Sequence, residues 1–308
     1  MTGEFSRLIL MMLLIGVVQG CSTLGPVRSV DDRVPLNKSV AELREAQLLD
    51  VWVELVDPGE LPEEEDDAMG LSMDIREAEA RYLAEQLRTT MEGSGYWGAV
   101  RLVPRNTTGS EQLVQGTILE SDGERLALEI TALDATGREW LKRTYRKEIE
   151  YAQYQTVSGG VTDPFQSLYN AIANDLAESR MKLDETEIRA IHRVAALRFA
   201  ADLAPDAFNS YLVEEKGRFS VIRLPAVDDP MYRRVQAIRD RDFLLIDTLN
   251  GHFGNFVREM GPPYTEWRKA RSEEAAALRE IEHEATKRKL LGVAAIIGAI
   301  AIEASGNN

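Results

Sequence analysis

The pattern of apolar positions predicts a mixed domain of strands and helices over residues 47–181. Apolar and β-branched residues from 48 to 56 predict a strand that stops at the turn Asp57-Pro58-Gly59. Apolar residues three and four apart then predict a helix over 75–91. The next elements are strands at 97–103, 113–119, 125–133 and 139–149, and a helix that begins at Asp163. This order is typical of the α+β class, in which a small mixed or antiparallel sheet packs with two helices.

The last three strands form a predicted meander. Leu126, Leu128, Ile130 and Ala132 alternate with more polar residues, so one face of the sheet is expected to be buried and the other solvated. Asp122-Gly123 predicts a tight hairpin between the first two of these strands, because glycine accepts a positive φ. A second turn is expected at 134–137.

Residues 182–289 predict a mainly helical domain. One helix ends near Ala204-Pro205, a short helix follows at 206–214, and 219–224 is expected to be a single extended segment. A long helix begins at Asp228-Asp229-Pro230 and runs to Gly261-Pro262-Pro263, where another long helix begins. Two long helices joined by a Pro-Pro turn predict an antiparallel helical hairpin.

Residues 290–308 form an apolar tail rich in glycine and alanine. The thirteen apolar residues 290–302 follow Lys287-Arg288-Lys289 and would rise only about 20 Å as a helix, short of the ~30 Å bilayer core. Gly292 and Gly298 provide a face suited to close helix packing. Three interpretations stay open: burial against the protein's own body, self-association or partner binding, and shallow insertion into a membrane.

The amino terminus carries a predicted signal peptide over residues 1–20, with Arg7 followed by a short apolar run. Val18-Gln19-Gly20-Cys21 ends in the only cysteine of the chain and resembles the lipobox of bacterial lipoproteins. The resemblance implies that Cys21 is acylated and becomes the first residue of the mature chain. Ser22 stands where an Asp would resemble the inner-membrane retention pattern, which favours an outer-membrane location facing the periplasm. An ordinary signal peptide with a chance cysteine is the alternative.

Polar residues 21–46, interrupted by Pro26 and Pro35, are expected to form a lipidated tether. The net charge of −15 argues against nucleic-acid binding and disfavours electrostatic adhesion to anionic lipids. Membrane attachment is therefore expected from acyl chains or from apolar sequence. Once Cys21 is acylated, no thiol remains for disulfide or redox chemistry.

Several segments of the first domain resemble one superfamily of bacterial lipoproteins. They are the strand 115–118, the hairpin that follows it, residues 132–140 and the helix 165–176. The superfamily contains the curli secretion channel, lipoprotein activators of penicillin-binding proteins and flagellar outer-membrane lipoproteins, and the amino-terminal domain of the Tol-system propeller protein is similar. The resemblance covers about residues 47–180 and implies a small sheet packed on helices and used for protein contacts. No long amphipathic strand pair supports a secretion pore.

Candidate chemistry is sparse. The three histidines lack the i, i+4 spacing of a helical zinc site, no Gly-x-Ser-x-Gly motif occurs, and neither a metal nor a cofactor is expected. The densest charged cluster lies in the long helix and consists of Arg239, Asp242, Asp247 and His252. Asp242 interrupts the apolar stripe, so we expect it to be half-buried and paired with an arginine. A structural ionic cluster is the favoured interpretation and an active site the alternative.

Tyr264 and Trp267, beside the Pro-Pro turn, are candidate partner contacts together with Gly292 and Gly298, although core packing is the favoured use of the two aromatic residues. The sequence thus favours a non-enzymatic, lipid-anchored envelope protein that works as a tether, adaptor or assembly factor through an envelope protein partner. One alternative is an envelope hydrolase acting on peptidoglycan through Asp242, Asp247 and His252. Another is an oligomeric component of an outer-membrane ring or channel, assembled through the apolar tail.

A Cys21→Ser substitution tests the anchor. We expect the variant to escape lipid attachment and to leave the membrane fraction after a salt wash, because acyl chains supply the attachment. The measurement is immunoblotting of washed membrane and soluble fractions, with a Ser22→Ala variant as control. Normal processing and continued membrane retention of Cys21→Ser would contradict acylation.

Overall fold

The computed structural model describes residues 26–40, 43–61, 72–150, 153–154 and 163–305. The predicted signal peptide and Cys21 lie outside these residues. Six strands form one mixed sheet in the order β1-β6-β5-β4-β2-β3. Their bounds are β1 Val27–Ser29, β2 Val51–Glu54, β3 Val100–Val103, β4 Gln112–Ser121, β5 Arg125–Asp134 and β6 Glu139–Glu148.

The remaining elements are helical apart from one small hairpin. The helices are α3 Met73–Ser94, α5 Gln166–Met181, α6 Glu185–Leu203, α7 Pro205–Phe208 and α8 Pro230–Ser305, with short 3-10 turns η1 Glu45–Gln47 and η2 Asn209–Tyr211. Strands β7 Leu212–Glu215 and β8 Arg218–Val221 pair antiparallel. The predicted α+β class is confirmed.

The sheet domain follows the expected order of elements. Strands β4, β5 and β6 form the antiparallel meander, whereas β2 lies parallel to both β3 and β4. The alternating residues of β5, from Leu126 to Ala132, are buried as predicted. Ser72 caps α3 instead of Asp74, and Gly95 ends it in a left-handed conformation instead of Gly93. Each cap of α3 lies only two residues from its predicted position, because capping interactions within a few residues determine where a helix begins and ends.

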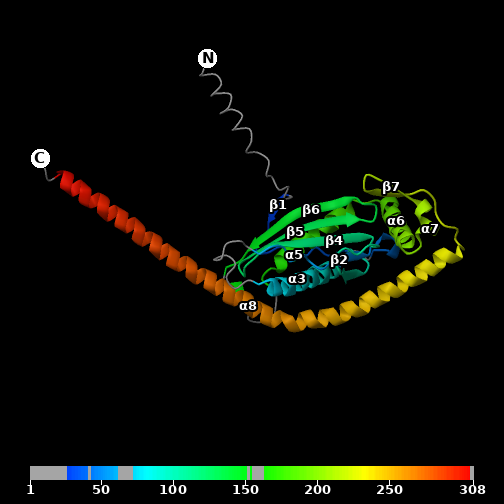
Figure 1. Cartoon of the computed structure of the whole chain (residues 1–308), viewed down its shortest axis with the longest axis horizontal. Coiled ribbons are helices and arrows are strands. Elements are labelled where there is room, and N and C mark those ends of the chain that lie inside the picture. Colours follow the sequence, from blue (N-terminus) through cyan, green and yellow to red (C-terminus); the bar gives the residue numbers. More distant parts are fainter. Residues whose placement is uncertain (1–25, 41–42, 62–71, 151–152, 155–162, 306–308) are drawn as a thin grey trace, which may run out of the picture.

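Helices α3 and α5 pack side by side on one face of the sheet, and the main core lies between them and the strands. Fully buried residues of this core include Leu83 and Met91 from α3, Ile130 and Tyr145 from the sheet, and Tyr169 from α5. Helix α6 covers one end of the sheet, where Ile191 and Ala195 pack with Leu49 and Ala135. Helix α8 runs along the body beside α3 (Figure 1).

The predicted helical hairpin is wrong, because α8 is a single helix of 76 residues that passes through Pro262 and Pro263. A proline removes one backbone donor and usually kinks or ends a helix. Here both prolines are exposed, and buried side chains dock α8 on either side of them. Val257 precedes the prolines, and Tyr264 and Arg268 follow them, all less than 8% exposed. Contacts before and after the prolines thus hold the helix to the body on both sides of them, and α8 curves as it passes along the body (Figure 1).

The predicted tether over 21–46 is also wrong for its described part. Strand β1 lies parallel to the edge strand β6, and Val30 joins the main core. The following residues lie along α5, where Asn170 Nδ2 donates to the Val34 carbonyl at 2.8 Å and Asn174 Nδ2 donates to the Pro35 carbonyl at 2.9 Å. A polar segment without periodicity can pack in this way, because side-chain amides satisfy its backbone groups.

The boundary predicted at residue 182 does not separate two bodies. Val257 and Tyr264 of α8 belong to the same core as α3, α5 and the sheet. The segment predicted as a short helix at 206–214 contains only α7 and η2 before β7 begins, and the single extended segment is one half of the β7–β8 hairpin. Lys216 and Gly217 form its turn with positive φ values of 52° and 75°.

The docked amino-terminal segment can be tested by proteolysis. An Asn170→Ala/Asn174→Ala variant loses the amides that hold residues 34–37, and each such hydrogen bond contributes about 1 kcal/mol. We expect trypsin to cut after Arg33 and Lys38 at least about tenfold faster than in the unmodified chain, as measured by mass spectrometry. A Glu178→Ala variant, exposed on the same helix, should not change this rate. Equally fast cleavage of the unmodified chain would show that the segment is not docked.

Candidate functional site

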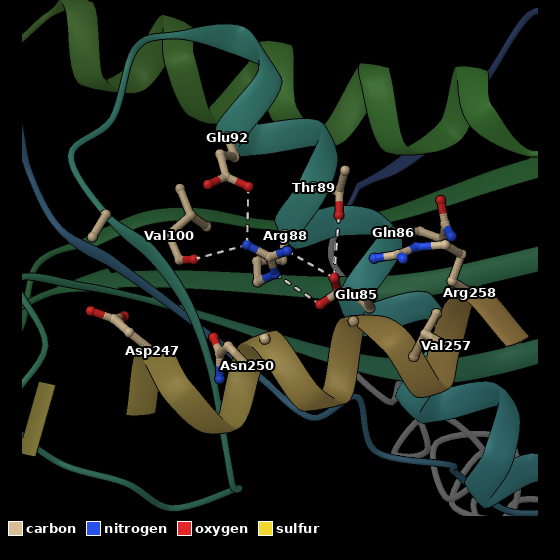
Figure 2. Close-up of a pocket in the computed structure, with 13 residues that line it drawn as sticks. Glu85, Gln86, Arg88, Thr89, Glu92, Val100, Asp247, Asn250, Val257 and Arg258 are labelled. Carbon is tan, nitrogen blue, oxygen red and sulfur yellow. Dashed lines mark hydrogen bonds and ion pairs between the residues drawn. The ribbon is translucent and has the colours of Figure 1, made fainter. Parts of the chain in front are cut away.

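A groove of about 680 Å3 separates α3 from α8 (Figure 2). Its walls come from α3, from the start of β3 and from the middle of α8. The lining residues are Glu85, Gln86, Arg88, Thr89, Glu92, Ala99, Val100, Asp247, Asn250, Gly251, Gly254, Val257 and Arg258.

Two glycines of α8 shape this groove. A Cβ atom at Gly251 would meet nothing within 4 Å, so the helix surface there is open. A Cβ atom at Gly254 would lie 3.3 Å from Glu85 Oε1, so the missing side chain lets α8 approach α3 closely. The two positions therefore combine a close helix contact with an adjacent hollow.

Arg88 is the central cation of the groove, and its donors are used within the protein. Its Nε and Nη2 atoms each lie 2.8 Å from an oxygen of Glu85, and its Nη1 lies 3.0 Å from Glu92 (Figure 2). The hydrogen bond to Glu85 is the main cause that raises the pKa of Arg88. The described lining residues include no histidine, cysteine or serine. The groove thus offers polar and apolar contacts to a ligand, and no nucleophile paired with a histidine base.

An ion pair and an amide join α8 to the sheet at one end of the groove. Arg101 of β3 donates from Nε to Asp247 at 2.7 Å and from Nη1 to Asp50 at 2.7 Å. Asn250 then pairs with both backbone groups of Leu102, accepting at 2.6 Å and donating at 2.8 Å. Because β3 is an edge strand, this amide occupies hydrogen-bonding positions that a further strand would otherwise use.

The structure does not bring the four residues of the predicted ionic cluster together. Asp247 binds Arg101, and the guanidinium of Arg239 lies 5.5 Å from the ring of Phe243. Asp242 and His252 are exposed, so the expected half-buried Asp242–arginine pair is wrong. Five residues turn a helix by about 140°, which places Asp242, Asp247 and His252 on three different faces. Their spacing alone could have shown this.

A buried ion pair that local sequence patterns did not predict attaches α8 to the body on the C-terminal side of Pro262 and Pro263. Arg268 donates to both carboxylate oxygens of Asp163, at 3.2 and 3.0 Å, and the two side chains are only 1% and 3% exposed. Tyr82 donates to the same carboxylate at 3.0 Å, and so does the backbone amide of Phe165 at 2.8 Å. Desolvation lowers the pKa of Arg268, but the charge of Asp163, the neighbouring hydroxyls of Tyr264 and Tyr169 and the hydrogen bonds to Asp163 together raise it well above the ordinary value.

Tyr264 reinforces this attachment, so its predicted role as an exposed partner contact is wrong. Its hydroxyl donates to Glu79 of α3, which also accepts from Ser121. Burial, and then the charge of Glu79, raises the pKa of Tyr264 well above its ordinary value. Trp267 is half-buried and packs against the main core. Both aromatic residues thus serve the core, the use that the sequence favoured over partner contact.

The turn between β4 and β5 completes the docking surface. Gly123 has a φ of 95°, and a Cβ atom there would lie 2.9 Å from the Cβ of Arg271. Ser272 donates to Glu124 at 3.2 Å. The Asp-Gly turn predicted for hairpin geometry therefore also allows α8 to pass close to its backbone.

Part of the apolar surface of α8 is not covered by the body. Met231, Leu245, Leu249 and Phe256 are between 45 and 59% exposed. Their spacings of 14, 4 and 7 residues place them within about 40° of one another around the helix. We call these four residues the outer arc. It lies beside the docked face, whose described residues include Val257, Tyr264 and Arg268.

The remaining predicted site residues are Gly292, Gly298 and Cys21. Gly292 and Gly298 lie in the last part of α8, whose backbone is helical, and their surroundings lie outside the described side chains. The lipidation site Cys21 lies outside the described residues. Within the described part of the chain, no group of three or more histidine, cysteine, aspartate or glutamate side chains is arranged to bind a metal. No helix in that part is long and apolar enough to span a bilayer.

Comparisons with known proteins assign no family. No family model and no curated protein matches the chain. A crystal structure that is similar to part of it is that of protein XCC0632 from Xanthomonas campestris, described under family model DUF330. The two share 12% sequence identity with a TM-score of 0.24, over 53% of this chain and 97% of that one. Similarity at this level carries no argument about fold or function, and the predicted lipoprotein resemblance stays a prediction.

Removing Asp163 tests the docking of α8. An Asp163→Ala variant leaves the Arg268 guanidinium buried without its counter-charge, which costs about 3–5 kcal/mol. We expect a matching fall in the free energy of unfolding, measured by urea denaturation. An Asp163→Ala/Arg268→Met variant should lose less, because no charge remains buried. Arg81→Ala, which breaks an exposed ion pair with Glu77, should change stability by less than about 1 kcal/mol. Equal effects of Asp163→Ala and Arg81→Ala would contradict this role.

Proposed function

We propose that this chain is a non-enzymatic, lipid-anchored envelope protein that acts as an adaptor or tether by docking a protein partner on α8. Acylated Cys21 attaches the chain to the outer membrane, and the folded body faces the periplasm. The observation that carries the proposal is the outer arc, an apolar surface that the body leaves uncovered.

The arrangement of α8 supports a docking role. A helix held by buried contacts loses little conformational entropy when a partner binds it, which improves affinity for a given contact area. Arg101–Asp247 and Asn250 hold the helix where the outer arc lies, and Arg268–Asp163 holds it further on. An amphipathic partner helix or an apolar groove would bury Leu245, Leu249 and Phe256 together. Lipid attachment would raise the local concentration of such a partner at the membrane.

The hydrolase alternative has lost the particular residues on which it depended. Asp242, Asp247 and His252 occupy different helix faces, and Asp247 is bound by Arg101. No described residue triad replaces them in the groove between α3 and α8. The adaptor proposal requires no such constellation, only a rigid surface with uncovered apolar side chains.

A photo-crosslinking side chain at position 249 tests the proposal in intact envelopes. We expect a discrete adduct with a second protein, because a partner on the outer arc would cover Leu249. The matched position is 244, whose leucine is 66% exposed but lies well outside the arc. Adduct mass and peptide sequencing identify the bound protein.

The same experiment separates the outcomes. Leu245→Asp should reduce adduct formation from position 249 by at least about tenfold, because loss of one buried leucine contact weakens binding by about 1.5–3 kcal/mol. A Leu244→Asp variant should leave it unchanged. Adducts of twice the chain mass would show self-association and overturn the adaptor role. Equal labelling from positions 244 and 249 would show that the outer arc binds nothing specific.

A further inference from the structure

The last part of α8 extends away from the body. Ser272 is bound to Glu124, and beyond it residues 273–305 continue as helix past the end of the sheet domain (Figure 1). At 1.5 Å per residue this stretch is about 50 Å long. A segment at its end can therefore meet a surface that the acidic body does not touch.

The end of this projecting helix carries a local positive charge. Lys287, Arg288 and Lys289 are consecutive cations in a chain with a net charge of −15. Arg288 is exposed, and its pair with Glu284 at 3.0 Å is a surface ion pair, which holds the guanidinium only weakly. Cations next to an anionic bilayer strengthen binding by roughly fivefold each. The same surface would repel the body, so only this end of the molecule is attracted.

The apolar residues that follow are divided between two helix faces. Steps of about 100° per residue place the positions of Leu290, Val293, Ile296, Ile297 and Ile300 on one face. The two glycines and four alanines of residues 290–302 occupy the rest of the circumference, which they share with Leu291 and Ile302. A helix with bulky residues along one side fits a membrane interface, with that side towards the acyl chains.

The polar ends of the segment favour an orientation along the interface. Three cations precede it, and Glu303 with the polar residues after it closes the other end. The thirteen apolar residues between them are about 20 Å long, too short for a ~30 Å hydrocarbon core. A helix that lies flat keeps both polar ends in water, whereas a perpendicular one would bury Glu303.

We propose that residues 287–302 of α8 bind an anionic phospholipid bilayer, lying in its interface with the Ile296 and Ile300 face towards the acyl chains. This contact is separate from the acyl chains on Cys21 and from protein docking on the outer arc, so it goes beyond the proposed function. It gives the protein a second attachment at the far end of α8. Two attachments are held far more firmly than one, because the second binding event is intramolecular.

Vesicle co-sedimentation tests the contact without the acyl chains. The mature chain with Cys21→Ser is mixed with vesicles of phosphatidylethanolamine and phosphatidylglycerol, or with vesicles of phosphatidylcholine alone. We expect binding to the anionic vesicles that weakens as salt is added, and much weaker binding to phosphatidylcholine. Because no acyl chain is present, failure here leaves acylation and adaptor function untouched.

Matched variants separate the bulky face from the small face. Ile296→Asp/Ile300→Asp should weaken binding at least tenfold, because two charges enter the acyl-facing side. Ala295→Asp/Ala299→Asp adds the same charges on the other side and should weaken binding much less. Reversal of the three cations to glutamate should lower binding to anionic vesicles by about a hundredfold. The body should unfold at the same urea concentration in every variant, since residues 287–300 lie beyond Ser272, the last docking contact among the described side chains.

Three results would overturn the proposal. One is that the chain binds neither the anionic vesicles nor the phosphatidylcholine vesicles. Another is equal weakening by the isoleucine and alanine variants. The third is a concentration-dependent oligomer in solution that Gly292→Leu/Gly298→Leu dissociates while vesicle binding stays absent, which would assign the segment to self-association.

Discussion

Attachment of α8 to the sheet domain depends on an ion pair that has almost no access to solvent. Removing a guanidinium and a carboxylate from water costs several kcal/mol per ion, and only good geometry with further hydrogen bonds offsets this cost. Asp163 meets that requirement, because it accepts from two nitrogens of Arg268, from Tyr82 and from the backbone of Phe165. The guanidinium in turn lies 4.3 Å from the ring centroid of Tyr264. A pair with so many fixed partners favours the register of α8 that brings Arg268 to Asp163.

The second attachment of α8, near the other end of the groove, has a different chemistry. Arg101 is shared between Asp50 and Asp247, and Asn250 satisfies the backbone of the edge strand β3. Between the two attachments Gly254 allows close approach to α3, while Gly251 leaves the groove open. The helix is therefore fixed by polar contacts along one face, and the outer arc beside that face stays uncovered because the body has no further element to cover it in the described residues.

The proposed functions use three separate parts of one molecule. The acyl group would attach the amino terminus, the outer arc would receive a protein, and the end of α8 would contact lipid. The body contributes rigidity, because long-range polar contacts hold the part of α8 that carries the outer arc in a defined direction. In this view the buried charges stabilise the docked helix and the exposed apolar residues provide the contacts.

The local sequence determined the meander, α3, α5 and their turns, because the periodicity of apolar residues, the helix caps and the turn glycines all act over a few neighbouring residues. The sequence also determined the length and charge of the apolar tail. Only the tertiary structure decided that α8 continues through Pro262-Pro263, that residues 27–37 pack against β6 and α5, and that Asp247 binds Arg101 instead of a neighbour on its own helix. Arg268 and Asp163 are 105 residues apart, and nothing in local periodicity relates them. Their pairing follows from burial, which requires each charge to find a partner wherever the fold brings one within reach.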